Sequence, residues 1–218
     1  MIYQNVKQVL QELPDAVELV GAVKGRTPEE ISEAIDAGLR IIGENYVEES
    51  EKCFAVIGKK AKWHMIGHLQ SRKVKKAVQL FDMIETVDSV KLAASIDRAC
   101  REIEKTMPIL IEINSAEEEQ KAGVLPLDAV SLITEISGLE NIHVMGLMTM
   151  GRYEDDPENM RHYFCKTKSL FDDIRAMDLP GVTMRYLSMG MSDSYQIAIK
   201  EGANIVRIGT RLFGQRTI

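Results

Sequence analysis

The sequence has few of the features that mark exported or membrane-bound proteins. It contains 3 cysteines in 218 residues, and Cys53, Cys100 and Cys165 lie far apart, in no metal-ligand spacing. An odd number of distant cysteines predicts reduced thiols and a cytoplasmic location. No apolar run approaches the ~20 residues of a membrane span, and the first residues lack a signal-peptide profile. We therefore expect no membrane partner.

The sequence also lacks an excess of positive charge. Lysine and arginine number 27 against 33 aspartates and glutamates, which gives a net charge of −6. The one basic cluster, residues 72–76, has the pattern of a solvated helix face. Because an acidic chain without a long basic run is a poor match for a polyanion, no nucleic-acid partner is predicted.

A metal centre is not predicted either. His64 and His68 are four residues apart, a spacing that two zinc ligands on one helix can have. Gly67 separates them, however, and the segment reads as a strand that runs into a turn.

Short apolar segments recur along the chain and alternate with helical patterns. They are rich in Ile, Val, Leu and Met with little polar alternation, which is typical of parallel strands buried on both faces. The predicted strands are Val17–Val23, Leu39–Gly43, Lys62–Ile66, Met83–Val87, Ile109–Ile113, His143–Thr149, Thr183–Leu187 and Ile205–Ile208.

The segments between these strands carry helix signals. Val90–Thr106 has apolar residues at three-four spacing, ending in Ile103, which predicts one buried stripe. Thr27, Pro28 and Glu30 form a helix-start signature. Further helices are predicted over Ser131–Ser137 and Asn159–Met177, and helix ends at Gly38, Gly138 and Gly202.

Eight strands that are each followed by a helix or turn predict an α/β protein with a single (β/α)8 TIM-type barrel, one domain spanning residues 1–218. The alternative is an open doubly wound sheet. That fold usually carries a G-x-G-x-x-G turn after its first strand, and this chain has none.

The residues with chemical potential fall at the carboxyl ends of the predicted strands, where barrels place their functional sites. Lys24 ends the first strand and is followed by Gly25, which leaves room for an aldehyde to reach its amine. Two later strands end in small, hydroxyl-bearing runs that can hold an anion with backbone N–H groups. The candidate residues at strand ends are Lys24, Asn45, His64, Ser188, Ser192, Gly209 and Thr210.

Arg207 lies inside a buried strand, so its guanidinium requires a partner. An acidic side chain and a heteroaromatic nitrogen of a ligand are both compatible with the sequence.

Seven runs of the sequence resemble the pyridoxal 5′-phosphate homeostasis proteins, the YggS/PROSC family. The most specific runs are Gly43-Glu-Asn-Tyr46, Trp63-His-Met-Ile-Gly67 and Ser188-Met-Gly-Met-Ser-Asp193. The others are Ala34–Gly38, Val87–Ser89 with Lys91-Leu92, Gly146–Met148 and Val206–Gly209. Together these runs are distributed over nearly the whole chain.

The resemblance implies a barrel like the N-terminal domain of alanine racemase, with pyridoxal 5′-phosphate (PLP) held as a Schiff base on Lys24. It implies phosphate contacts from Ser188, Ser192, Gly209 and Thr210, and Arg207 facing the pyridine nitrogen. We also place Asn45 and His64 among the cofactor-binding residues because of their strand-end positions.

The sequence departs from the family pattern around the lysine. The family usually has a serine before it and a Lys-Pro pair after it, whereas here Val23 precedes Lys24 and Gly25-Arg26-Thr27-Pro28 follows. The rim beside the lysine is therefore expected to differ in shape and charge.

We expect a binding protein for intracellular PLP (vitamin B6) homeostasis rather than an enzyme. An arginine at the pyridine nitrogen can only donate, so the ring is a weaker electron sink. The chain ends soon after the eighth strand, so no β domain is expected to deliver a second catalytic base. The alternative is a PLP-dependent enzyme with weak or specialised activity on amino acids.

A phosphosugar or indole-phosphate enzyme would need a pair of carboxylates at the barrel mouth, and Glu44 is the one candidate found. The expected partners are PLP and apoenzymes that use PLP, and the expected state is a monomer.

Overall fold

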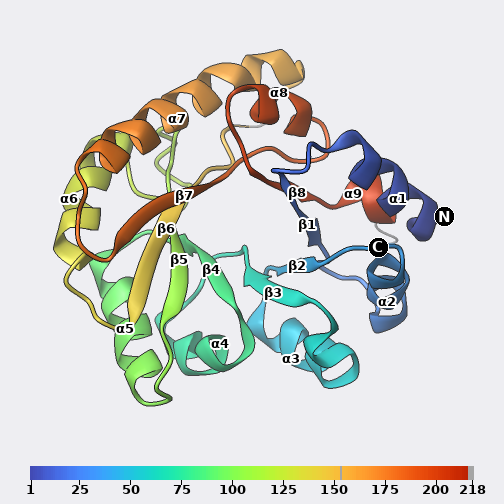
Figure 1. The fold of residues 1–218 in the computed structure, drawn as a ribbon, viewed down its shortest axis with the longest axis horizontal. Helices are drawn as coiled ribbons and strands as arrows, with labels where there is room; N and C mark the ends of the chain where they lie inside the picture. The colour runs from blue at the N-terminus through green and yellow to red at the C-terminus, as the bar shows by residue number, and fades with distance from the viewer. Residues whose placement is uncertain (153, 216–218) are drawn as a thin grey trace.

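A closed barrel of eight parallel strands forms the centre of the computed structural model, which describes residues 1–152 and 154–215. Each strand pairs with its neighbours in chain order, and β8 closes the ring on β1 (Figure 1). This confirms the predicted (β/α)8 barrel. The strands are β1 (Glu18–Ala22), β2 (Ile41–Glu44), β3 (Lys62–Met65), β4 (Met83–Val87), β5 (Met107–Glu112), β6 (Ile142–Met148), β7 (Val182–Ser188) and β8 (Ile205–Ile208).

Helices surround the barrel on the outside, and short 3-10 turns join some of them to the strands (Figure 1). The helices are α1 (Ile2–Glu12), α2 (Pro28–Asp36), α3 (Val47–Ile57), α4 (Val74–Leu80), α5 (Val90–Arg101), α6 (Pro126–Ile136), α7 (Arg161–Ala176), α8 (Tyr195–Lys200) and α9 (Thr210–Phe213). The 3-10 turns are Gly58–Lys60, Ser71–Lys73 and Pro157–Met160.

Most of the barrel strands are buried on both faces, as their mainly apolar patterns predicted, although Thr183 and Arg185 of β7 are exposed. Every residue of β2, β4 and β8 is buried. One face packs against the helices and the other fills the barrel interior, where it leaves room for a small number of polar side chains.

The predicted start of α2 is confirmed in detail. The Thr27 hydroxyl accepts from the Glu30 amide at 3.3 Å, and the Glu30 carboxylate accepts from the Thr27 amide at 2.9 Å. This reciprocal capping box satisfies two amides that the first helical turn leaves free. It fixes the direction in which the chain leaves Lys24.

The helix predicted over Val90–Thr106 is too long. α5 ends at Arg101, and Ile103, which we placed in the buried stripe, is 39% exposed. The chain reverses at Glu104, whose φ is +51°, and this turn directs Met107 into β5. Lys105 then donates to the carbonyls of Val78 and Phe81 at 2.8 and 2.7 Å.

The basic cluster lies on a solvated face, as predicted. Lys73 pairs with Glu48 at 2.7 Å and Lys76 with Glu51 at 2.9 Å, both across to α3. These cations are therefore partly neutralised by local acids. The three cysteines are free thiols, and in the described part of the chain no helix is long and apolar enough to cross a membrane.

Candidate functional site

Lys24 lies at the carboxyl end of the barrel, two residues beyond β1. Its side chain is half-buried, and its Nζ lies 4.9 Å from the centre of the Tyr46 ring. No ion pair or hydrogen bond holds this amine among the described residues. The amine is therefore free to meet an incoming molecule.

Close backbone packing sets the position of Lys24 and of Asn45, which follows β2. The Val23 amide donates to the Gly43 carbonyl at 3.0 Å, so the end of β1 is fixed to β2. Gly67 approaches Asn45 so closely that a Cβ would lie 2.4 Å from the Asn45 carbonyl oxygen. Only glycine permits that approach. The half-buried Asn45 is thus held at the same end of the barrel as Lys24.

The loops after β7 and β8 bring Ser192, Gly209 and Thr210 together. The Arg211 amide donates to the Ser192 hydroxyl at 3.3 Å, and the Arg207 amide donates to the Gly190 carbonyl at 3.0 Å. Ser192 is half-buried and Thr210 is exposed, so both hydroxyls can be reached from solvent. Small residues and accessible hydroxyls of this kind suit a phosphate.

A second group of polar side chains lies deeper, inside the barrel. Arg207 donates to the Ser188 hydroxyl at 2.6 Å and to the Thr149 carbonyl at 2.9 Å. The Ser188 hydroxyl donates to Glu85 at 2.7 Å, and the other oxygen of Glu85 lies 2.7 Å from Nδ1 of His64. We call Arg207, Ser188, Glu85 and His64 the interior network.

Two of the predicted site residues, Ser188 and His64, are buried within the interior network rather than exposed at the mouth of the barrel. Ser188 is fully buried, and its hydroxyl is engaged by Arg207 on one side and Glu85 on the other. His64 is 3% exposed and lies within β3. A phosphate contact from the Ser188 hydroxyl, which the resemblance implied, would compete with both of its present contacts.

The partner that Arg207 requires is an acidic one, reached through Ser188. Burial lowers the pKa of the Arg207 guanidinium, and the negative charges of Glu85 and Glu112 oppose that effect. Burial also acts to raise the pKa of Glu85, but its contacts with His64, Arg207 and Ser188 outweigh burial and lower it. Glu85 is therefore a carboxylate that the network keeps ionised.

Two more carboxyl groups are buried near the strand ends. Burial and the charge of Glu49 raise the pKa of Glu44 to about 7. Burial and the charge of Asp88 raise the pKa of Glu112 to about 7, although Arg207 opposes the shift. One oxygen of each group has no hydrogen-bond partner among the described atoms. Both groups therefore exchange a proton near neutral pH.

Sequence reasoning missed Glu85 and Glu112 and identified only Glu44. The signal was present, because Glu85 and Glu112 interrupt the apolar runs Met83–Val87 and Ile109–Ile113. A charged residue in a strand buried on both faces must find a partner inside the protein. That rule was applied to Arg207 and applies equally to these two glutamates.

The two histidines that first suggested zinc do not meet. His64 contacts Glu85, whereas His68 is exposed, with Nδ1 3.9 Å from an oxygen of Asp88. Within residues 1–152 and 154–215, no group of three or more His, Cys, Asp or Glu side chains could hold a metal ion.

Arg26 shapes the rim beside Lys24. Its guanidinium donates to the Gly214 carbonyl, pairs with Glu30 at 3.1 Å and lies 5.5 Å from the centre of the Phe213 ring. Arg26 therefore joins the loop after β1 to the end of α9. The positive charge of Arg26 is already paired with Glu30.

The site residues fit a molecule with an aldehyde, an aromatic ring and a phosphate. Lys24 offers an unengaged amine, and the ends of β7 and β8 offer hydroxyls and amides for an anion. Arg207 offers a buried group that can only donate hydrogen bonds.

Comparison with known proteins supports this view of the fold. The sequence matches the alanine racemase N-terminal domain family over residues 1–217. It is 39% identical to the pyridoxal phosphate homeostasis protein of Aquifex aeolicus, covering 98% of this chain and 97% of that protein. It is 34% identical to the protein of the same name from Pasteurella multocida, covering 99% and 94%.

Solved structures agree. PipY of Synechococcus elongatus, with PLP bound, superposes with a TM-score of 0.91 at 30% identity, covering 98% of this chain and 100% of that one. An alanine racemase from Clostridium difficile superposes with a TM-score of 0.83 at 16% identity, over 56% of its own chain. The second likeness concerns the fold alone.

Proposed function

The chain belongs to the family of pyridoxal phosphate homeostasis proteins, and from this membership we propose that it binds PLP and takes part in PLP homeostasis. The observation that carries the proposal is that Lys24, Ser192, Gly209 and Thr210 all follow the carboxyl ends of barrel strands, and that the similar structure of PipY is described with PLP bound. We take residues 1–218 as one PLP-binding domain.

Lys24 is the residue that would hold the cofactor covalently. Its side-chain amine is the group that would bond to the aldehyde carbon of the cofactor. The protein needs only to position that amine, and the fixed ends of β1 and β2 do so. The nearby ring of Tyr46 shields one side of the amine from solvent.

The phosphate would lie between the ends of β7 and β8. The Ser192 and Thr210 hydroxyls and the amides around Gly209 can each donate to a phosphate oxygen. Bonds to a charged acceptor are about twice as strong as bonds between neutral groups. The phosphate should therefore contribute a large share of the affinity.

Arg207 would donate a hydrogen bond to the pyridine nitrogen and so disfavour protonation of that nitrogen. A guanidinium donates hydrogen bonds and cannot accept one. The ring nitrogen would therefore accept the hydrogen bond from Arg207, which requires that nitrogen to be unprotonated. When bound in this way, PLP supplies a weaker electron sink for carbanion chemistry. We therefore propose storage or delivery of PLP to apoenzymes rather than turnover of amino acids.

Two measurements test this proposal. Calorimetric titration should give clearly tighter binding of PLP than of pyridoxal. Equal affinities for the two molecules would contradict the proposed phosphate site. Incubation of the PLP-loaded protein with alanine should give no racemisation or transamination at enzymatic rates. Turnover with kcat on the order of 1–10³ s⁻¹ would instead favour the enzyme alternative.

A further inference from the structure

Glu12, the last residue of α1, contacts two residues from the other end of the chain. Both oxygens of its carboxylate accept from the Arg211 guanidinium, at 2.8 and 2.7 Å. The Tyr195 hydroxyl donates to the same carboxylate. Glu12 is 199 residues from Arg211 and 183 from Tyr195, so this contact joins α1 to both α8 and α9.

The two partners of Glu12 adjoin the proposed phosphate site. We call the segments after β7 and β8, residues 189–194 and 209–210, the phosphate loops. Tyr195 follows the first of these loops directly, and Arg211 follows the second. The Arg211 amide also donates to the Ser192 hydroxyl at 3.3 Å, so the two loops touch. One carboxylate therefore holds the chain at the end of each phosphate loop.

The contact is partly shielded from water. The side chains of Glu12 and Arg211 are 28% and 37% exposed, and Tyr195 is buried, with its ring centre 5.3 Å from the guanidinium carbon of Arg211. The hydrogen bond from Tyr195 and the charge of Arg211 lower the pKa of Glu12, although burial opposes that effect. Glu12 is therefore ionised at neutral pH, as its pairing with an arginine requires.

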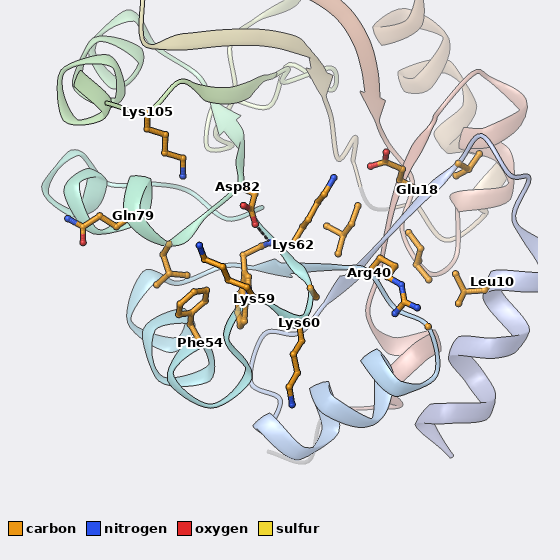
Figure 2. A pocket seen from close by; sticks show the side chains of 17 residues that line it. Leu10, Glu18, Arg40, Phe54, Lys59, Lys60, Lys62, Gln79, Asp82 and Lys105 are labelled. Carbon is orange, nitrogen blue, oxygen red and sulfur yellow. Dashed lines mark hydrogen bonds between the residues drawn. The ribbon is translucent and has the colours of Figure 1, made fainter. Parts of the chain in front are cut away.

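The helix that carries this carboxylate is fixed to the barrel. Val6 and Val9 of α1 are buried in the core. Leu10 extends from α1 toward the cavity at the starts of the strands (Figure 2). Asn5 donates to the Leu212 carbonyl at 3.1 Å, which gives α1 a second contact with α9, and the two helices lie side by side in Figure 1. α1 is therefore a fixed point of attachment for the phosphate loops.

We propose that Glu12 is a positioning residue for the phosphate of PLP, because its contacts with Tyr195 and Arg211 hold the two phosphate loops together. The inference rests on the proposed binding of PLP. Glu12 does not touch the phosphate, since two anions repel each other. It keeps the hydroxyls of the loops at a fixed spacing, so less conformational freedom is lost when PLP binds.

The direction of one mutational effect distinguishes positioning from simple electrostatics. Removal of a negative charge near an anion site should by itself tighten phosphate binding, and it would also free the Arg211 guanidinium to approach the phosphate. If Glu12 positions the loops, Glu12→Ala should instead weaken PLP binding by about three- to tenfold, the scale of one hydrogen bond or slightly more. Pyridoxal, which has no phosphate, should lose less than about twofold in affinity. Calorimetry measures both affinities.

Tyr195→Phe tests the same contact without a change of charge. It removes the hydroxyl and keeps the ring, so it should weaken PLP binding less than Glu12→Ala does. The double variant should bind PLP within about twofold of Glu12→Ala, because both changes break one shared contact. The ³¹P signal of bound PLP should move in each variant relative to wild type.

Two controls lie on α6, on the opposite side of the barrel from α1 (Figure 1). Glu135→Ala makes the same change of charge at an exposed position. Ile133→Val shortens a buried side chain and so lowers stability without removing a contact of Glu12. Both controls should keep the wild-type ratio of PLP affinity to pyridoxal affinity and the wild-type ³¹P signal.

Two results would overturn the positioning role alone. One is PLP binding by Glu12→Ala that equals or exceeds that of wild type, and the other is an equal loss of affinity for PLP and pyridoxal. Equal affinities of the wild type for PLP and pyridoxal would instead contradict the phosphate site itself, and the role of Glu12 with it.

Discussion

Arg207 and Ser188 meet inside the barrel, with a hydrogen bond of 2.6 Å from the guanidinium to the hydroxyl. That hydroxyl donates a hydrogen bond of 2.7 Å to Glu85, so the serine links a buried cation to a buried anion. The arginine is thereby fixed below the strand ends. The same contacts leave the Ser188 hydroxyl little freedom to bind a ligand.

The first prediction follows from the position of Ser188. Ser188→Ala should destabilise the protein by about 1–3 kcal/mol, because it removes a bond from each of two buried charged groups. It should change the affinities for PLP and pyridoxal by the same factor. Thermal unfolding and calorimetry measure both effects, and a selective loss of PLP affinity would instead make Ser188 a phosphate ligand.

The second prediction concerns the proposed phosphate site. Ser192→Ala and Thr210→Ala should each weaken PLP binding by roughly 1.5–3 kcal/mol, the value of a hydrogen bond to a charged group. Pyridoxal binding should change little. Ser131→Ala, at an exposed position on α6, is the control. If Ser192→Ala and Thr210→Ala bound PLP as tightly as the control variant, the assignment of the phosphate site to these two hydroxyls would be wrong.

The third prediction concerns the charge pair around Arg207. Arg207→Met leaves Glu85 with one cationic neighbour fewer and should destabilise the fold by about 3 kcal/mol. Adding Glu85→Gln should recover part of that loss, giving a coupling of roughly 0.5–3 kcal/mol in a double-mutant cycle. Arg98→Met, at an exposed position on α5, should have little effect. Additive losses would show that the two charges do not interact.

The fourth prediction is a pH dependence of stability from Glu112. Its pKa is about 7 in the folded protein against 4.5 as the reference value. Between these values the folded state binds more protons than the unfolded state, so this group makes the free energy of unfolding fall as pH rises. Glu112→Gln should therefore stabilise the protein by about 1–3 kcal/mol at pH 8 and by much less at pH 5.

The exposed Glu135 provides the control for that comparison. Glu135→Gln should give the same stability difference at both pH values. If Glu112→Gln and Glu135→Gln had identical pH profiles in urea unfolding, Glu112 would not carry a raised pKa.

The fold was predictable from the sequence because parallel barrels leave a strong pattern. Strands buried on both faces read as short apolar runs, and Met83–Val87 and Ile205–Ile208 match the structure to the residue. The end of α5 was not predictable in this way. The apolar spacing continues to Ile103, but the reversal at Glu104 depends on where β5 must begin.

The positions of the candidate site residues at strand ends were predictable, and the contacts inside the barrel were less so. Lys24, Ser192 and Thr210 follow strand ends, a position that can be read from the chain. The interior network depends on which side chains face inward at one level of the barrel. Glu85 and Ser188 are 103 residues apart and meet only through strand register, which the sequence does not display.

The central claim is that Lys24 holds PLP, and reductive trapping tests it most directly. Wild type, Lys24→Ala and the exposed-lysine control Lys52→Ala are loaded with PLP, treated with borohydride and analysed by peptide mass spectrometry. We predict one reduced adduct, on the peptide containing Lys24, in wild type and the control, and its loss in Lys24→Ala. An adduct on Lys24→Ala at wild-type yield would contradict the account.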